Sequence, residues 1–227
     1  MSEKLPPIKV HAHRLVAENL RFELFFDHIE APDGQQVENY LVVAPRVKTD
    51  QLVTGVSVFP IWEGKVGLLH IYRHPLRAYC WELPRGFIDE GEAPEVSARR
   101  ELEEETGLTC RAEDLQSLGL YAPEAGTLAA RVHLYVAHDC ARENDFVAQE
   151  FGHHALQFFT LDEIGALIEQ GEIQEPGTLI AYYRYLNHAY PRNLHRPRRH
   201  AQRRKKLSSS LARLGVDTRR GGGDQAL

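Results

Sequence analysis

Three glutamates, Glu101, Glu104 and Glu105, stand three and four residues apart in a segment with helical composition. Residues at this spacing lie on one face of a helix, so their carboxylates repel one another. A hard divalent cation offsets that repulsion, and Mg²⁺ is usually held by a few carboxylates together with phosphate oxygens. The spacing therefore predicts a cation site for phosphate chemistry, although an acidic run by itself is also typical of a solvated helix face.

The residues around these glutamates fit the same chemistry. Arg100 and Glu92 can pair with the carboxylates and orient them, as groups behind a metal ligand do. Gly86 ends an expected strand where the chain must turn tightly, which brings a backbone carbonyl near the cation.

Residues 86–108 combine nine defined positions: Gly86, Glu92, Arg100, Glu101, Leu102, Glu104, Glu105, Gly107 and Leu108. At every one the segment resembles the signature of the Nudix hydrolases. That resemblance implies an α/β/α sandwich around a mixed sheet, with the signature forming a loop–helix–loop. It also implies cleavage of a diphosphate linked to another moiety, with Mg²⁺ or alternatively Mn²⁺ as cofactor.

The resemblance also assigns roles to single residues. Glu101 and Glu105 correspond to metal ligands, and Glu104 to a further ligand or a base that orients water. The backbone carbonyl of Arg85 corresponds to a fourth metal contact, and Arg100 belongs to the catalytic set.

The substrate class depends on sequence outside the signature. The segment IYRHPLRAYCWELPRG and Pro123, 15 residues beyond Leu108, resemble the ADP-ribose and nucleoside-diphosphate-sugar branch. That branch implies an N-terminal hairpin exchanged between two subunits, hence a homodimer. The chain departs from the branch at residues 122–126 and 129–131, where Ala-Pro-Glu-Ala-Gly and Ala-Ala-Arg stand.

The branch often places its catalytic base on a late loop. Glu143 and Glu150 are available there, and we favour Glu150, with a solvated acid as the alternative. Arg73 is predicted to bind a substrate phosphate, unless it forms a structural ion pair. Trp81 is predicted to stack on the substrate, and core packing is its alternative. His153, with the neighbouring His154, is interpreted as a loop residue without a ligand role.

Hydrophobic periodicity divides the chain into three parts. Residues 1–50 hold strand-like runs at 21–29 and 37–43 that predict a hairpin. Residues 51–190 form the expected hydrolase domain, with helices over 92–106, 161–170 and 176–189 and strands over 115–121, 131–137 and 155–160. Residues 191–227 are too poor in large apolar groups to fold and are predicted to be a disordered basic tail.

Charge is divided unevenly along the chain. Residues 190–227 contain 11 Lys and Arg against two Asp, whereas the remainder holds 16 basic and 30 acidic residues. An acidic body is unlike a nucleic-acid binder but suits a protein that collects cations. The basic tail could contact nucleic acid or an anionic surface weakly, or stay solvated.

Other features concern the compartment. Cys80, Cys110 and Cys140 are odd in number and widely spaced, so neither a disulfide framework nor a zinc site is indicated. The sequence shows no membrane span and no signal-peptide run near its start, which together favour the cytoplasm.

We therefore expect a pyrophosphatase that splits ADP-ribose, or a related nucleoside diphosphate sugar, into a nucleoside monophosphate and a sugar phosphate. Dinucleoside polyphosphates and RNA 5′ ends are alternative substrates. A non-catalytic regulator that senses a ligand is a third possibility, but it would be expected to lose the carboxylates that this chain retains.

Overall fold

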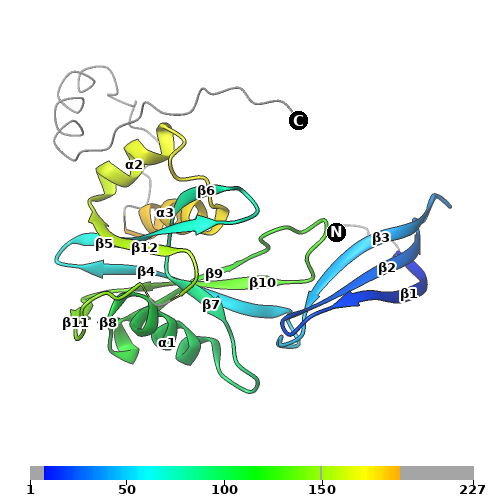
Figure 1. Ribbon diagram of the computed structural model, residues 1–227, viewed down its shortest axis with the longest axis horizontal. Coiled ribbons are helices and arrows are strands. Elements are labelled where there is room, and N and C mark those ends of the chain that lie inside the picture. The colour runs from blue at the N-terminus through cyan, green and yellow to red at the C-terminus, as the bar shows by residue number, and fades with distance from the viewer. Residues whose placement is uncertain (1–7, 149, 190–227) are drawn as a thin grey trace. The chain divides into compact units, whose positions relative to one another are not determined.

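The computed structural model describes residues 8–148 and 150–189, which belong to a compact unit spanning Met1–Tyr190 (Figure 1). A seven-stranded mixed sheet forms its centre. Strands β10 and β4 pair in parallel, and the other neighbours pair antiparallel. The sheet contains β4 (Val53–Trp62), β5 (Lys65–Arg73), β6 (Ala78–Glu82), β7 (Arg85–Phe87), β9 (Leu115–Tyr121), β10 (Arg131–Ala137) and β12 (His153–Phe159). Two short strands, β8 (Leu108–Thr109) and β11 (Ala141–Arg142), pair separately.

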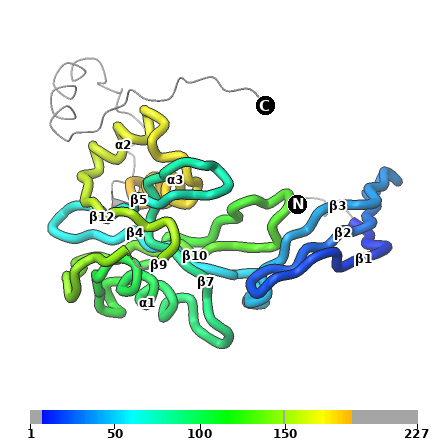
Figure 2. Tube along the Cα trace, viewed as in Figure 1, coloured from blue at the N-terminus to red at the C-terminus, as the bar shows by residue number. Residues whose placement is uncertain are grey.

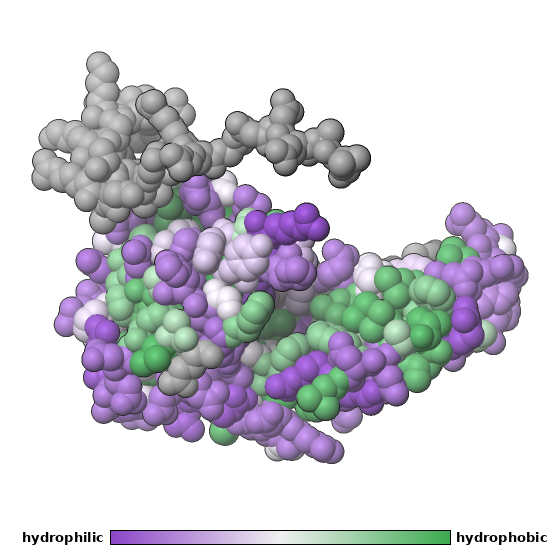
Figure 3. Space-filling view, in the orientation of Figure 1, coloured by the Kyte–Doolittle hydropathy of each residue, from purple (hydrophilic) through white to green (hydrophobic). Residues whose placement is uncertain are grey.

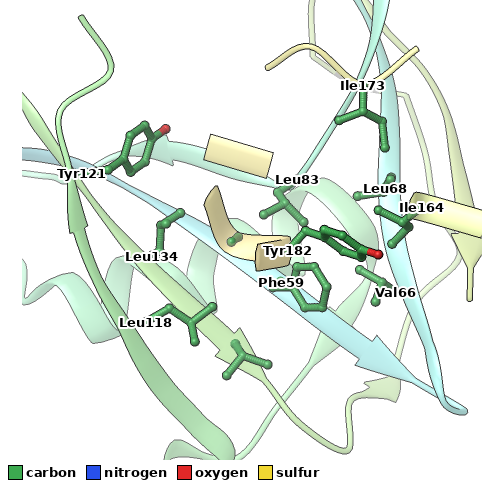
Figure 4. Close-up of a cluster of buried hydrophobic side chains, with 12 residues drawn as sticks. Phe59, Val66, Leu68, Leu83, Leu118, Tyr121, Leu134, Ile164, Ile173 and Tyr182 are labelled. Atoms are coloured by element: carbon green, nitrogen blue, oxygen red, sulfur yellow. The ribbon is translucent and has the colours of Figure 1, made fainter. Parts of the chain in front are cut away.

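Side chains of the central strands alternate between two hydrophobic cores. Phe59 of β4 and Leu134 of β10 point into a core shared with α2 (Leu161–Glu169) and α3 (Pro176–Ala189) (Figure 4). The adjacent residues Val58 and Tyr135 point to the opposite face, into a second core against α1 (Pro94–Thr106). Successive residues of a strand face opposite sides, so helices cover both faces. The predicted α/β/α sandwich with a mixed sheet is confirmed.

The three expected helices are present, with ends within two residues of those predicted. α1 begins at Pro94 and stops at Gly107, which adopts the left-handed conformation and donates its N–H to the Glu103 carbonyl. α2 begins after Thr160, whose side chain and Glu163 form a reciprocal capping box. These ends depend on local hydrogen bonds, which explains why sequence patterns located them well.

The N-terminal extension is a three-stranded sheet rather than the predicted hairpin. Strand β1 (Lys9–Glu18) pairs with β2 (Phe22–Glu30), which pairs with β3 (Gln36–Pro45). All residues of β1 are exposed, so no buried apolar face marks this strand in the sequence. Figure 2 shows β3 leading on into β4, and β3 also contacts the 121–131 connection through the Val43 N–H and the Thr127 carbonyl, 2.8 Å apart.

The predicted tail, residues 191–227, lies outside the described residues. None of the helices in the described part of the chain combines the length and apolar character that crossing a bilayer requires.

Candidate active site

A cleft of 720 Å³ lies where α1, β4, β7 and the N-terminal sheet meet. Of the predicted site residues, Trp81 is absent from its lining and the others are present: Arg73, Arg85, Arg100, Glu101, Glu104, Glu105, Pro123 and Glu150. The tertiary structure therefore brings together residues separated by nearly 80 positions in the chain.

Glu101 lies against the backbone of β7 at Gly86. A Cβ atom added to Gly86 would come within 2.1 Å of the Glu101 carboxylate, closer than any real contact. Gly86 is needed for this close approach, not for the tight turn that the sequence analysis expected. Glu101 is 6% exposed, and burial raises the pKa of its carboxyl, whereas Arg100 lowers it.

Glu105 is the most buried carboxylate of the site, with 4% of the residue exposed. Its Oε2 accepts a hydrogen bond of 2.7 Å from the backbone N–H of Arg85. The pKa of Glu105 is raised to about 8, mainly by burial and also by the charges of Glu101 and Glu150, whereas the Arg85 hydrogen bond lowers it. A carboxylate in this position is destabilised unless a positive charge approaches it.

Arg100 connects the carboxylates. Its guanidinium donates to Glu101 at 2.7 Å and to the half-exposed Glu104 at 3.1 Å. The other side of the guanidinium holds Glu92 at 3.0 Å and the Phe87 carbonyl at 3.1 Å. These contacts lower the pKa of Glu92 to about 2, through the hydrogen bond from Arg100 first. Arg100 thus fixes the loop before α1 to the acidic face of the helix.

Two residues near Glu105 come from the late loop and β12. Glu150 lines the cleft, as predicted, whereas Glu143 is absent from its lining. His153 begins β12 instead of lying in a loop, and its Nε2 is 3.4 Å from Glu105 Oε1. No local sequence pattern marks His153 for this position, because only the pairing of β12 with β5 brings it to the α1 carboxylates.

A buried ion-pair network supports the cleft. Glu82 binds Arg73 through two hydrogen bonds of 2.9 and 2.7 Å and Arg85 at 2.8 Å. Arg85 also donates to Glu175 at 3.0 Å, and Glu175 accepts the N–H groups of the first turn of α3. Arg73 lines the cleft, but its guanidinium is held by this structural pair, the alternative that the sequence left open.

Glu82→Gln should destabilise the protein by about 2–4 kcal/mol, because it leaves two partly buried arginines without their shared carboxylate. Urea unfolding measures this change. Glu113→Gln is the matched control, since Glu113 pairs with Arg111 on the surface and should cost under ~1 kcal/mol. Equal stabilities of the two variants would contradict a supporting role for Glu82.

Trp81 lies outside the cleft. Its ring stacks on His70, with centroids 4.4 Å apart, and meets Phe159 edge-on at 5.1 Å. These contacts favour core packing over the predicted substrate contact. Pro123 lines the cleft, and its contact with a substrate stays a prediction.

Besides His153, the cleft contains an arginine and an aromatic residue that were not expected from the sequence. Arg21, between β1 and β2, lies over the Phe87 ring at 5.5 Å and forms no ion pair with any residue that the structure describes. Phe151 is 89% exposed and also lines the cleft. Arginines and aromatics are too common for position alone to mark them.

The donor set fits a divalent cation. Buried carboxylate oxygens of Glu101 and Glu105 converge near the cleft, with Glu104 and Glu150 alongside, and hard cations of the Mg²⁺ type take such oxygen ligands. Burial raises the pKa of Glu105, so a cation that approaches this carboxylate would stabilise its charged form. The site can therefore hold a cation next to a bound phosphate.

Comparisons with known proteins agree with this geometry. The chain is 34% identical over 160 residues to a methanol dehydrogenase activator of Bacillus methanolicus, covering 70% of this chain and 82% of that protein. It is 28% identical over 162 residues to an ADP-ribose pyrophosphatase of Bacillus subtilis, with the same shares covered. A crystal structure of an ADP compounds hydrolase superposes with a TM-score of 0.68 at 21% identity, over 83% of this chain and 99% of that one.

The NUDIX domain profile matches residues 51–180, the part of the chain that carries the central sheet, α1 and the carboxylates. The late-loop Glu150 and the β12 residue His153 also fall inside this range. The chain belongs to the Nudix family and is a hydrolase of phosphoanhydride bonds, related to the ADP-ribose pyrophosphatases.

Proposed function

We propose that this protein is a Mg²⁺-dependent pyrophosphohydrolase of ADP-ribose or a related nucleoside diphosphate sugar. Its products would be a nucleoside monophosphate and a sugar phosphate. The observation that carries the proposal is the pair of buried carboxylates, Glu101 and Glu105, in a cleft that also presents arginines. The relative from Bacillus subtilis, an ADP-ribose pyrophosphatase, supports this substrate class.

The residues divide the work of such a reaction. Glu101, Glu104 and Glu105, with the Arg85 carbonyl, would hold the cation, and Arg100 keeps two of these carboxylates in place. When bound, the cation supplies Lewis-acid polarisation of a phosphoryl oxygen and neutralises charge on the leaving phosphate. Glu150 would accept the proton of the attacking water, since it lies at the cleft without an arginine partner among the described residues.

Arg21→Ala should raise KM for the nucleotide substrate about tenfold with little change in kcat, because Arg21 is free to bind a diphosphate. Steady-state kinetics with ADP-ribose measures both constants. Arg14→Ala is the control, since Arg14 also lies over an aromatic ring, Phe26, but is absent from the cleft lining. An unchanged KM in the Arg21 variant would remove this residue from the binding site.

The substrate is tested with a panel of ADP-ribose, other nucleoside diphosphate sugars, dinucleoside polyphosphates and 5′-triphosphate RNA. We expect Mg²⁺-dependent formation of AMP and ribose 5-phosphate from ADP-ribose. Turnover confined to dinucleoside polyphosphates or RNA ends would overturn the ADP-ribose assignment. Absence of hydrolysis with saturable ligand binding would favour the regulator instead.

The N-terminal sheet is proposed to mediate a homodimer. Val10, Leu15, Val16, Val37 and Leu41 are exposed on its strands, and Figure 3 shows apolar surface gathered over this sheet on the face in view. Apolar patches of this kind mark protein interfaces. Light scattering after size-exclusion chromatography should give a molecular mass twice that of the chain. The Val10→Asp variant should give a mass closer to that of the monomer. A monomeric wild type would overturn this proposal.

Two further predictions complete the proposal. Weak contact of the basic tail, residues 191–227, with nucleic acid is tested by a salt titration of binding with and without the tail; no tail-dependent difference would remove it. A cytoplasmic location stays a prediction that rests on the cysteines, which are unpaired in the structure.

A further inference from the structure

The turn before β12 directs an imidazole at the acidic centre of the cleft. Gly152 takes a φ of 90°, and a Cβ there would come within 2.6 Å of the Tyr72 carbonyl. The Gly152 carbonyl accepts the Tyr72 N–H at 2.8 Å, and the His153 N–H bonds the Glu150 carbonyl at 3.1 Å. This backbone clamp fixes both Glu150 and His153 relative to β5.

The His153 side chain is buried, with 5% of it exposed. Its Nε2 lies 3.4 Å from Glu105 Oε1 and 3.7 Å from Glu150 Oε2, and the three donor atoms all lie within 4.8 Å of one another. The groups come from three separate parts of the fold: the start of β12, helix α1 and the late loop.

The separation between His153 Nε2 and Glu105 Oε1 is the one expected of two ligands around a single ion. A hydrogen bond would place nitrogen and oxygen about 2.7–3.2 Å apart. Two donor atoms that share a cation at about 2.0–2.2 Å are instead separated by roughly 3–3.6 Å. The 3.4 Å distance from His153 to Glu105 falls in the second range, and Glu150 needs only a small shift to join it.

Among the described residues, none forms a hydrogen bond with the ring nitrogens of His153. The near neighbours of the ring are the two carboxylates. A ring nitrogen this close to two carboxylates, with no hydrogen bond of its own, is available as a ligand. A cation between the imidazole and the carboxylates would supply the missing partner.

We propose that His153 Nε2 is a ligand of the cation held by Glu105, with Glu150 Oε2 completing the set and Glu150 Oε1 left for the proton of the attacking water. Imidazole nitrogen suits first-row transition metals, whereas Mg²⁺ prefers oxygen ligands throughout. The site should therefore prefer Mn²⁺, or a similar transition metal, over Mg²⁺. This inference rests on the proposed metal-dependent function of the cleft and specifies which metal serves it best.

The test uses the full-length protein loaded with Mn²⁺. Electron spin-echo envelope modulation detects a directly bound ¹⁴N nucleus, and titration by electron paramagnetic resonance gives the Mn²⁺ affinity. We expect a nitrogen signal in the wild type and its loss in His153→Ala, with affinity reduced about tenfold or more. His153→Asp should restore Mn²⁺ binding through oxygen, without the nitrogen signal, and should narrow the preference for Mn²⁺ over Mg²⁺.

His154→Ala is the matched control, because His154 is the exposed neighbour and contacts His70 and Tyr79 outside the cluster. It should match the wild type in both measurements. A wild type without bound nitrogen, or a nitrogen signal that persists in His153→Ala, would overturn the inference. The wild-type signal is informative even if a variant fails to fold.

The same measurements separate this inference from the proposed function, since they need no substrate. Nitrogen coordination without hydrolysis of any nucleotide would overturn the proposed function alone. Hydrolysis of ADP-ribose with equal use of Mg²⁺ and Mn²⁺, and no bound nitrogen, would overturn the inference about His153 and leave the proposed function standing.

Discussion

Glu105→Gln is expected to lower kcat for ADP-ribose by at least about a thousandfold, because the amide removes the most buried negative charge from the cation site. Gln has nearly the same shape, and its side-chain oxygen can still accept the 2.7 Å hydrogen bond from the Arg85 N–H. The fall in kcat would therefore result from the lost negative charge and not from a change in side-chain shape. Steady-state hydrolysis in saturating Mg²⁺ measures it.

The same variant should be more stable than the wild type when both are stripped of metal. The folded pKa of Glu105 is raised from 4.5 to about 8, so the folded state holds the proton more tightly than the unfolded chain does. The contribution of Glu105 to the free energy of unfolding is therefore fully present below pH 4.5 and is lost as pH rises through about 8. Glu105→Gln escapes this loss, and its gain in free energy of unfolding should be largest above pH 8.

Melting temperatures in EDTA and in Mg²⁺ separate the loss of cation binding from the relief of the destabilising Glu105 charge. The wild type should gain stability on adding metal, whereas Glu105→Gln should start higher and gain little. Glu103→Gln is the control, because Glu103 lies on the same helix but is exposed and absent from the cleft lining. Full activity in Glu105→Gln would contradict the assignment of Glu105 to the cation site. A melting temperature in EDTA below that of the wild type would contradict the predicted destabilisation by the Glu105 charge.

Gly86→Ala is expected to reduce kcat at least about a hundredfold, because small displacements of catalytic groups cost rates of this order. The added methyl would lie 2.1 Å from the Glu101 carboxylate, so Glu101 must leave its position against β7. That movement also breaks its 2.7 Å contact with Arg100. Kinetics with ADP-ribose and Mg²⁺ affinity should both show the loss.

A matched glycine tests whether the effect is specific. Gly126 has its nearest contact at 3.3 Å, with the flexible end of the Glu124 side chain, so Gly126→Ala should leave kcat within about threefold of wild type. Near-native kcat in Gly86→Ala would show that the carboxylate of Glu101 does not need this position.

The signature region was predictable because its information is local. Helix α1 and its end at Gly107 follow from capping and periodicity, and the i, i+3, i+4 spacing alone places Glu101, Glu104 and Glu105 on one face. The start of α2 was predictable for the same reason, because its capping box involves only residues 160–163. The sequence therefore determined the fold class, the reaction family and the face of the helix that carries the carboxylates.

Long-range pairing decided the rest. Residues such as His153 and Arg21 reach the cleft only because β12 pairs with β5 and because the N-terminal sheet lies beside β7. Strand β1 has no buried residue to mark it, and Gly86 is required by the approach of a side chain 15 positions later. No periodicity encodes such contacts, since they depend on which segments meet in space. The reactive carboxylates were thus visible in the sequence, whereas their buried partners and the walls of the cleft were set by the tertiary structure.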